Sequence, residues 1–394
     1  MTPDPDRTNE EAPGGTGEDA ARERRFAAWN RAPRRLADGP AGGTLAGWLA
    51  RLAEVGAGVW DLAGRPDLYG DGVVTALEER TAALLGTGAA AFFPTGTMAQ
   101  QIALRCWADR TGSPVVALHP MSHPERHERG ALVRLAGLHT VHPTAEPRMP
   151  TADEIRELPE PFGTLLLELP LRDAGFVLPT WEELVETVTA ARERDAVVHL
   201  DGARLWECTE HFGRPLTEIA ALADTVYVSY YKSLGGLSGA ALAGPPDLVE
   251  EARAWRHRYG GQLFQQWPAA LSALVGLERE LPRLPEYVAH ARTVAGALRE
   301  GLAAAGVPWF RIHPEEPHTH QFQVWLPYGA EELTEAGVRQ AEEDGTVLFR
   351  WWGAPGPPGT AMAEVTVGAP GLGWRPADVR EALSAFLARV PATG

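Results

Sequence analysis

Short apolar runs alternate with amphipathic stretches along most of the chain from residue 74 onward. Three of the amphipathic stretches have the periodicity of helices, VTALEERTAALLG, MAQQIALRCWADR and WEELVETVTAARER, and Gly86 ends the first of them. The apolar runs have the length of strands buried on both faces: AAAFF (89–93), VVAL (115–118), TLLLEL (164–169), AVVHL (196–200) and TVYVS (225–229). Strands separated by helices in this way predict an α/β domain with a mostly parallel central sheet.

A different pattern follows in the last third of the chain. The stretch 269–304 predicts a long helix or a helix pair that leads out of the α/β domain. Beyond it, HQFQVWL, TVLFRWW and MAEVTVG predict strands, and helices are expected near 331–344 and 376–389. We therefore predict a disordered acidic tail at 1–22, a large α/β domain at 23–273 and a smaller C-terminal α+β domain with an antiparallel sheet at 274–394.

Composition and charge narrow the class of protein. The 394 residues include 36 basic and 52 acidic side chains, a net charge of −16 that argues against nucleic acid or an anionic membrane as partner. No apolar run approaches the roughly 20 residues that span a bilayer, and the N-terminal segment lacks the features of a signal peptide. The two cysteines, Cys106 and Cys208, form neither a disulfide framework nor a metal motif. We expect a cytoplasmic globular protein.

One basic residue differs from all the others. Thirty-five of the 36 are arginine, and Lys232 is the only lysine. An ammonium group can lose its proton and act as a nucleophile, whereas a guanidinium stays charged. Composition alone leaves two interpretations open, a chemical role for Lys232 or a lysine present by chance.

The position of Lys232 favours the chemical role. Ligands of open α/β sheets bind beyond the carboxyl ends of the strands; Asp201 directly follows AVVHL, and Lys232 comes three residues after TVYVS. A lysine amine can hold the aldehyde of pyridoxal 5′-phosphate (PLP) as a Schiff base, and a carboxylate can keep the pyridine nitrogen protonated. The pair predicts a PLP site, although Asp201 would also suit a helix N-cap.

A phosphate site is predicted at Thr95-Gly96-Thr97, which follows AAAFFP and opens a helix. Backbone N–H groups at a helix N-terminus bind anions. Gly96 would allow close backbone approach and Thr97 would donate its hydroxyl to a phosphate oxygen. The alternative is an ordinary helix cap.

Six ordered motifs over about residues 50–275 resemble the threonine aldolase/β-eliminating lyase family of fold-type-I PLP enzymes. They are DLYGDGVVTALEERTAALLG, AAAFFPTGTMAQQIAL, SHPERHERGA, HLDGARLWE, YKSLGGLSGAALAG and ARAWRHRYGG. The C-terminal domain matches the family only in outline. The resemblance implies a fold-type-I α/β architecture and a homodimer or homotetramer.

The resemblance also assigns roles to single residues. It implies that His123 stacks on the PLP ring, with Glu128 and Gly130 also matching, and that Arg204 binds the substrate carboxylate. The alternatives are a turn histidine and a structural ion pair. Histidines are dense here, at 119, 123 and 127, but no acid or cysteine pattern accompanies them, so we expect no metal. The expected cofactor site comprises Lys232, Asp201, His123, Gly96, Thr97 and Arg204.

The chain departs from the family where the substrate would bind. The family has E-N-T-H-N where this chain has Glu168-Leu169-Pro170-Leu171-Arg172, so the family histidine that contacts the substrate hydroxyl falls on Leu171. Near MAEVTVG the chain has Ala363 and Glu364 in place of a second carboxylate-binding arginine. Arg172 is a candidate for that contact, or it faces solvent. The base for the hydroxyl is then His127 or a water held by His123.

These observations predict a PLP-dependent lyase that cleaves a β-hydroxy-α-amino acid, other than threonine itself, to glycine and an aldehyde. The alternatives are β-elimination, transamination or racemisation at the same site, or a PLP-fold protein without turnover. A small amino acid bound by Arg204, His127 and Arg172 is the only partner expected besides a second copy of the chain.

Overall fold

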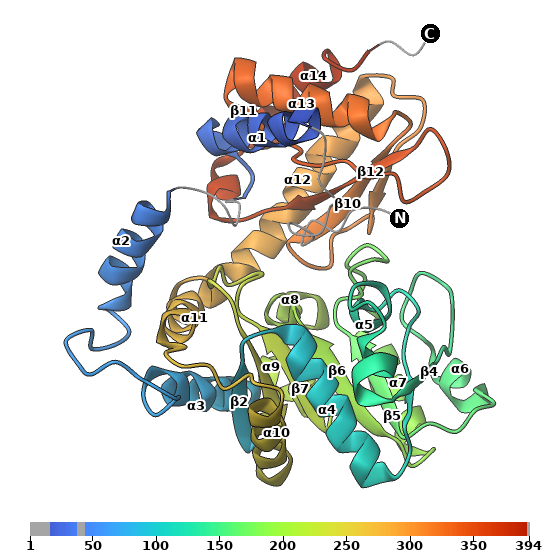
Figure 1. The fold of residues 1–394 in the computed structure, drawn as a ribbon. Helices are drawn as coiled ribbons and strands as arrows, with labels where there is room; N and C mark the ends of the chain where they lie inside the picture. The colour runs from blue at the N-terminus through green and yellow to red at the C-terminus, as the bar shows by residue number, and fades with distance from the viewer. Residues whose placement is uncertain (1–15, 38–43, 392–394) are drawn as a thin grey trace. The chain divides into compact units, whose positions relative to one another are not determined.

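The structure is a computed structural model that describes residues 16–37 and 44–391 (Figure 1). Its described residues form two compact units, which we treat separately. The larger unit is Ala46–Pro285, and the smaller one combines Met1–Leu45 with Glu286–Gly394. No helix in these described ranges is long and apolar enough to cross a membrane.

The larger unit is built on a seven-stranded sheet in the order β2-β8-β7-β6-β5-β3-β4. Five neighbouring strands, from β7 to β4, are parallel, while β8 runs antiparallel to both β7 and β2. The strands are β2 (Ala89–Phe93), β3 (Val115–Ala117), β4 (His139–Val141), β5 (Thr164–Glu168), β6 (Val197–Gly202), β7 (Thr225–Ser229) and β8 (Ala240–Gly244). The predicted mostly parallel sheet is confirmed.

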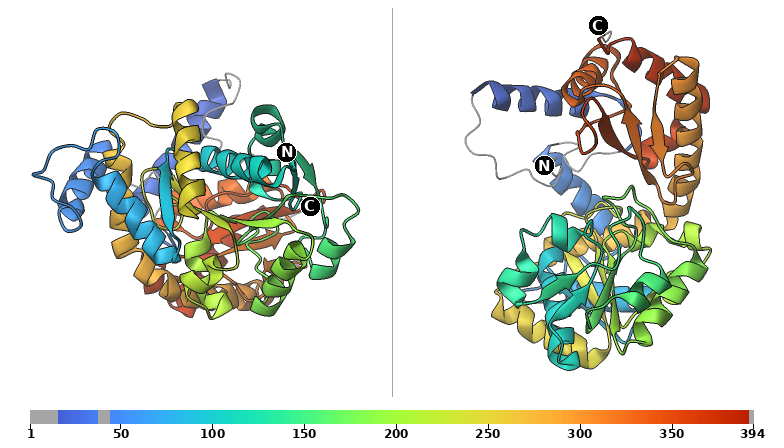
Figure 2. Two further views of the ribbon diagram at one scale, coloured as in Figure 1. Left: turned by 90° about the horizontal axis from the view of Figure 1, so that it is seen from below. Right: turned by 90° about the vertical axis from the view of Figure 1, so that its right-hand side faces the viewer.

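Helices lie on both faces of this sheet (Figure 2). One face is covered by α4 and α10, whose apolar side chains form a buried cluster with Phe93, Tyr227 and Leu242 of the strands. The helices of the larger unit are α2 (Leu45–Gly56), α3 (Val73–Leu85), α4 (Gly96–Thr111), α5 (His123–Arg126), α6 (Ala152–Glu157), α7 (Trp181–Arg192), α8 (Thr209–Phe212), α9 (Leu216–Ala220), α10 (Pro246–Arg258) and α11 (Trp267–Arg279).

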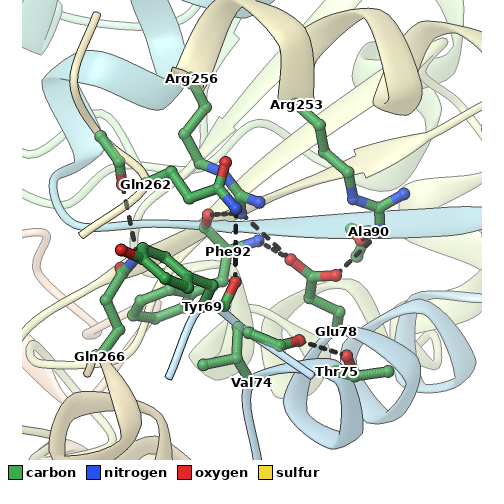
Figure 3. Close-up of polar contacts among 12 residues, drawn as sticks. Tyr69, Val74, Thr75, Glu78, Ala90, Phe92, Arg253, Arg256, Gln262 and Gln266 are labelled. Atoms are coloured by element: carbon green, nitrogen blue, oxygen red, sulfur yellow. Dashed lines mark hydrogen bonds and ion pairs between the residues drawn. The ribbon is translucent and has the colours of Figure 1, made fainter. Parts of the chain in front are cut away.

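The outer edge of β2 is closed by charged side chains, which we call the edge cluster: Glu78 of α3 with Arg253 and Arg256 of α10 (Figure 3). Glu78 Oε1 accepts a hydrogen bond from the backbone N–H of Phe92 at 2.7 Å. Arg253 donates to the carbonyl of Ala90 at 2.9 Å, and Arg256 donates to the carbonyl of Phe92. Because β2 is the edge strand of the sheet that the described residues form, these side chains satisfy backbone groups that an edge strand leaves unpaired.

The smaller unit is an α+β domain around an antiparallel sheet in the order β12-β10-β9, as predicted. A second, two-stranded sheet pairs β1 with β11 in parallel. The elements are α1 (Thr16–Arg31), β1 (Arg34–Arg35), α12 (Leu284–Ala304), β9 (Arg311–His313), β10 (Gln321–Leu326), α13 (Ala330–Asp344), β11 (Thr346–Val347), β12 (Ala361–Thr366) and α14 (Pro376–Leu387).

Three expectations differ from the structure. Residues 23–37, expected in the large domain, group with the small unit, because Ala28, Trp29 and Ala32 pack on α13 and β11. The division also falls after Pro285, not after residue 273. Of the expected tail, residues 1–15 lie outside the described part, whereas 16–22 are helical in α1, consistent with their good helix formers Glu, Ala and Arg.

The run TVLFRWW was predicted as a strand of the antiparallel sheet, and this is wrong. Only Thr346 and Val347 are extended, and they pair with β1. The rings of Phe349 and Trp352 lie 4.9 Å apart in the core of the smaller unit, with Phe386 against both. Packing against α14 therefore takes these aromatic residues out of the sheet.

Candidate active site

The parallel register brings three strand ends together in the larger unit. Glu168 at the end of β5 pairs with Asp201 of β6, and Asp201 pairs with Tyr227 of β7. Lys232 lies in the turn three residues beyond β7. Two acids and the only lysine are thus at one edge of the sheet, which is where α/β sheets bind ligands.

A pocket lies at this edge. Its lining contains six of the eight predicted site residues together with two further acids and three apolar residues: His123, His127, Glu168, Leu169, Pro170, Arg172, Asp173, Asp201, Ala203, Arg204 and Lys232. All of them belong to the larger unit. The two predicted residues that do not line it are Gly96 and Thr97.

Asp201 is 1% exposed, and its Oδ1 accepts a hydrogen bond from the backbone N–H of Ala203 at 3.2 Å. Burial raises the pKa of this carboxyl to about 6, and the positive charge of Lys232 opposes the rise. The alternative that Asp201 is a helix N-cap is wrong, since the residue lies within β6 (Val197–Gly202).

The turn that carries Lys232 is fixed by its neighbours. Ser233 donates a hydrogen bond to Glu207, a carboxylate that is 1% exposed. The N–H of Gly236 bonds the carbonyl of Tyr230 at 2.8 Å, and Gly235 has a φ of 67°, which favours glycine. Lys232 itself is half-buried, so its amine is held at the pocket on a constrained backbone.

His123 begins α5 and contacts two carboxylates, one through its ring and one through its backbone. Its Nδ1 lies 3.3 Å from Glu128 Oε1, and Gln101 donates to the other oxygen of Glu128 at 2.8 Å. Its backbone N–H donates to Glu168 Oε2 at 2.7 Å. The Glu128 carboxylate therefore restrains the imidazole, and Glu168 anchors the backbone at the start of α5.

Glu168 is a site residue to which the sequence patterns assigned no role. One oxygen binds the N–H of His123 and the other binds the N–H of Arg172 at 3.1 Å. Burial raises the pKa of Glu168 to about 7, and repulsion from Asp201 adds to the rise. The signal was present in the sequence, because Glu168 ends the buried run TLLLE as Asp201 ends VVHL.

His127 and Asp173 face each other across the pocket lining. His127 Nε2 lies 3.0 Å from Asp173 Oδ2 and 3.2 Å from Oδ1. Burial raises the pKa of Asp173, but the hydrogen bond and charge of His127 outweigh it and leave that pKa below its usual value. The His127 ring centroid lies 5.3 Å from that of His123. Asp173 was not anticipated from the sequence.

Two arginines complete the polar lining. Arg172 is 7% exposed, so the alternative that it faces solvent is wrong. The guanidinium of Arg204 lies 5.4 Å from the ring centroid of Phe176, and its Nε makes no hydrogen bond within the described residues. A planar guanidinium is well suited to a carboxylate, and the Nε of Arg204 is one donor left for such a contact. By contrast, Leu171 is fully buried and does not line the pocket.

Gly96 and Thr97 form the first turn of α4, capped by Thr95, whose Oγ1 accepts from the N–H of Met98 at 3.2 Å. A Cβ at Gly96 would come within 2.1 Å of Tyr227 Oη. Since Tyr227 is the register partner of Asp201, the α4 N-terminus packs against the strand next to this acid. Glycine is required here for that packing, independently of any phosphate.

No group of three or more His, Cys, Asp or Glu side chains is arranged to hold a metal among the residues that the structure describes.

The chain resembles known proteins in sequence. The family model for beta-eliminating lyases matches residues 63–323. The low specificity L-threonine aldolase of Escherichia coli (strain K12) is 32% identical over 244 residues, which cover 60% of this chain and 72% of the relative. The low-specificity L-threonine aldolase 1 of Arabidopsis thaliana is 28% identical over 284 residues, 70% of this chain and 77% of the relative.

Solved structures of known proteins are also similar to this chain. A Listeria monocytogenes EGD-E protein assigned as an L-allo-threonine aldolase is 34% identical, with a TM-score of 0.82, covering 93% of this chain and 98% of its own. A structure of serine palmitoyltransferase with PLP is 20% identical, with a TM-score of 0.61 over 86% of this chain and 83% of its own, and shows likeness of fold alone. The fold is that of the fold-type-I PLP enzymes. The family match covers more than half of the chain, which therefore belongs to the beta-eliminating lyase family.

Proposed function

We propose that the protein is a PLP-dependent lyase of the threonine aldolase type, which cleaves a β-hydroxy-α-amino acid between Cα and Cβ to give glycine and an aldehyde. The observation that carries the proposal is that Asp201 and the only lysine, Lys232, line one pocket at the carboxyl ends of neighbouring parallel strands. The names of the relatives, several of which are low-specificity threonine aldolases, support the reaction class.

The donor set of the pocket fits PLP. A carboxylate that is 1% exposed is costly to bury, and a protonated pyridine nitrogen would be its matching charged donor. Lys232 would hold the aldehyde carbon, His123 would pack against the ring, and the α4 N-terminus with Thr97 would bind the phosphate. When bound, PLP supplies the electron sink for the bond that breaks at Cα.

The remaining groups would bind the substrate and exclude water. Arg204 and Arg172 are the two guanidinium groups of the pocket, and one or both would hold the substrate carboxylate. Leu169, Pro170 and Ala203 form the apolar part of the lining. Because Leu171 contributes no polar group to the pocket, we expect a substrate side chain other than that of threonine to be preferred.

The test of the cofactor is spectroscopic. Protein purified with PLP should absorb visible light, and Lys232→Ala should lose that band. Lys232→Arg is the matched variant, since it keeps the positive charge but cannot bond the aldehyde, and it should lose the band as well. A wild-type protein that stays colourless after reconstitution would reject the proposal.

The test of the reaction separates products. Threonine, allo-threonine and bulkier aryl β-hydroxy amino acids of both configurations are offered, and aldehyde is measured apart from keto acid and ammonia. Aldehyde with an equal amount of glycine is expected. Release of keto acid and ammonia without aldehyde would show that the protein is a β-eliminating lyase and would reject the aldolase reaction.

Two further parts of the proposal concern the setting of the protein. We propose a cytoplasmic location, supported by two buried free cysteines, Cys106 and Cys208, which suit a reducing compartment. We also propose a homodimer or homotetramer, which equilibrium sedimentation tests directly.

A further inference from the structure

Cleavage of a β-hydroxy amino acid needs a base for the hydroxyl proton, and the pocket contains a limited number of candidates. Its titratable side chains, apart from the two arginines, are Lys232, Asp201, Glu168, His123, His127 and Asp173. The proposed function assigns Lys232 and Asp201 to the cofactor. A side-chain base is therefore to be found among the other four.

Two of these four are committed to positioning. Both oxygens of Glu168 accept backbone N–H groups, at 2.7 and 3.1 Å, and the residue is 7% exposed. The Nδ1 of His123 faces the Glu128 carboxylate at 3.3 Å, and its ring would pack on the cofactor. Either group would have to give up its present contacts to approach a substrate oxygen.

His127 and Asp173 have the arrangement of a base and its orienting acid. The Asp173 carboxylate is 3.0 Å from Nε2, so it selects the tautomer in which Nε2 carries the proton and Nδ1 carries the lone pair. The side chains are 16% and 21% exposed, which leaves a hydrogen bond between them largely shielded from water. The positive charges of Arg172 and Arg126 also act on Asp173 and help keep it ionised.

We propose that His127, oriented by Asp173, is the general base for the substrate β-hydroxyl; this inference rests on the proposed function. His127 takes the hydroxyl proton, the O–H electron pair becomes the second bond of the aldehyde C=O, and the Cα–Cβ pair remains on Cα. A proton then returned to Cα completes glycine. Aldol addition in the reverse direction would use His127 in its protonated form as the acid.

This assignment separates two activities of one site. Cleavage needs the β-hydroxyl base, whereas binding of glycine and exchange of its α-proton do not, because glycine has no β-oxygen. General bases of this kind contribute about 10²–10⁴-fold to a rate. His127→Gln should thus lower the kcat of cleavage by at least about 100-fold, with the dissociation constant and α-proton exchange of glycine changed by less than about threefold.

The experiment uses the PLP-loaded full-length protein. Cleavage is followed by aldehyde release, glycine binding by the change in visible absorption, and α-proton exchange by NMR in D₂O. His127→Phe keeps a ring without a base and should match His127→Gln. His142→Gln is the matched control, an exposed histidine paired with Glu125 at 3.6 Å outside the pocket, and it should behave as wild type.

Asp173 is a positioning residue in this scheme, and two variants of Asp173 test that role separately. Asp173→Asn should lower the kcat of cleavage by about 10-fold or more with little change in the KM, and Asp173→Glu should recover part of the loss. Loss of fold in either variant would appear in the visible band and the melting temperature.

The outcomes are distinguishable. Cleavage within threefold of wild type in His127→Gln would overturn the assignment and leave the proposed function intact. Equal loss of cleavage, glycine binding and exchange would also overturn it, since that would indicate a structural role. A wild-type protein that binds glycine but releases no aldehyde from any β-hydroxy amino acid would reject the proposed function. It would also reject the role of His127 as the general base.

Discussion

Replacing Glu78 by glutamine removes the only negative charge of the edge cluster while it keeps the side chain's length. Glu78 contacts Arg253 at 2.8 Å and Arg256 at 3.3 Å, and the side chains of Glu78 and Arg256 are each only 10% exposed. Burial lowers the pKa of Arg256 below its usual value, which shows that its charge is held at a desolvation cost. Glutamine would leave that buried charge without its counter-charge.

The expected loss follows from this geometry. Breaking a buried pair by removing one partner costs about 3–5 kcal/mol. We expect the lower end, about 3 kcal/mol, because the amide oxygen can still accept from Phe92 and Arg256 still donates to the Phe92 carbonyl. The larger unit is about 240 residues long, so each kcal/mol shifts its melting temperature by about 2–4 °C. Glu78→Gln should therefore melt about 6–12 °C lower than wild type.

The assay is thermal unfolding followed by circular dichroism and calorimetry at fixed PLP concentration. Glu250→Gln is the matched control because Glu250 pairs with the same Arg253, at 3.4 Å, but is 76% exposed. Surface pairs contribute about 0–1 kcal/mol, so this control should melt within about 4 °C of wild type. If Glu78→Gln and Glu250→Gln have the same melting temperature, the buried charge pair of the edge cluster does not stabilise the fold.

Two further perturbations test the strand ends. Gly96→Ala should lower the melting temperature and weaken retention of PLP, because its Cβ would come within 2.1 Å of Tyr227 Oη, and the added change Tyr227→Phe should recover part of the loss; no recovery would contradict the contact. Glu168→Gln should change the slope of stability against pH. The pKa of Glu168 is raised from 4.5 to about 7 on folding, so the folded state binds more protons and wild-type stability falls as pH rises through this window. The variant lacks that fall, so its free energy of unfolding relative to wild type, measured by urea unfolding, should rise between pH 4.5 and about 7. Curves of unfolding free energy against pH that run parallel for the two proteins would refute the raised pKa of Glu168.

Much of the site was predictable because its geometry follows from short sequence segments. TLLLE, VVHL and TVYVS are continuous apolar runs, and parallel strands bring their carboxyl ends to one edge, so the sequence alone predicts that Asp201 and Lys232 lie close together. Strand β8 was missed because AALAG lacks the β-branched and aromatic residues that mark strands. It forms through its pairing with β2 and β7.

The parts that could not be predicted depend on contacts between distant segments. His127 and Asp173 are 46 residues apart, and Glu78 and Arg253 are 175 apart. The helix α1 joins the smaller unit through Trp29 on α13, more than 300 residues away along the chain. No local periodicity records such contacts, and only the side-chain geometry of the folded unit reveals them.

Lys232, the only lysine of the chain, has a practical consequence for analytical chemistry. Besides the α-amine of the chain, the amine of Lys232 is the only primary amine in the sequence, because the other 35 basic residues are arginine. An amine-directed reagent therefore has no surface lysines to label. Borohydride reduction in the presence of PLP should leave one modified peptide containing Lys232, so that mass spectrometry measures cofactor occupancy in crude extracts without a background from this chain's other residues.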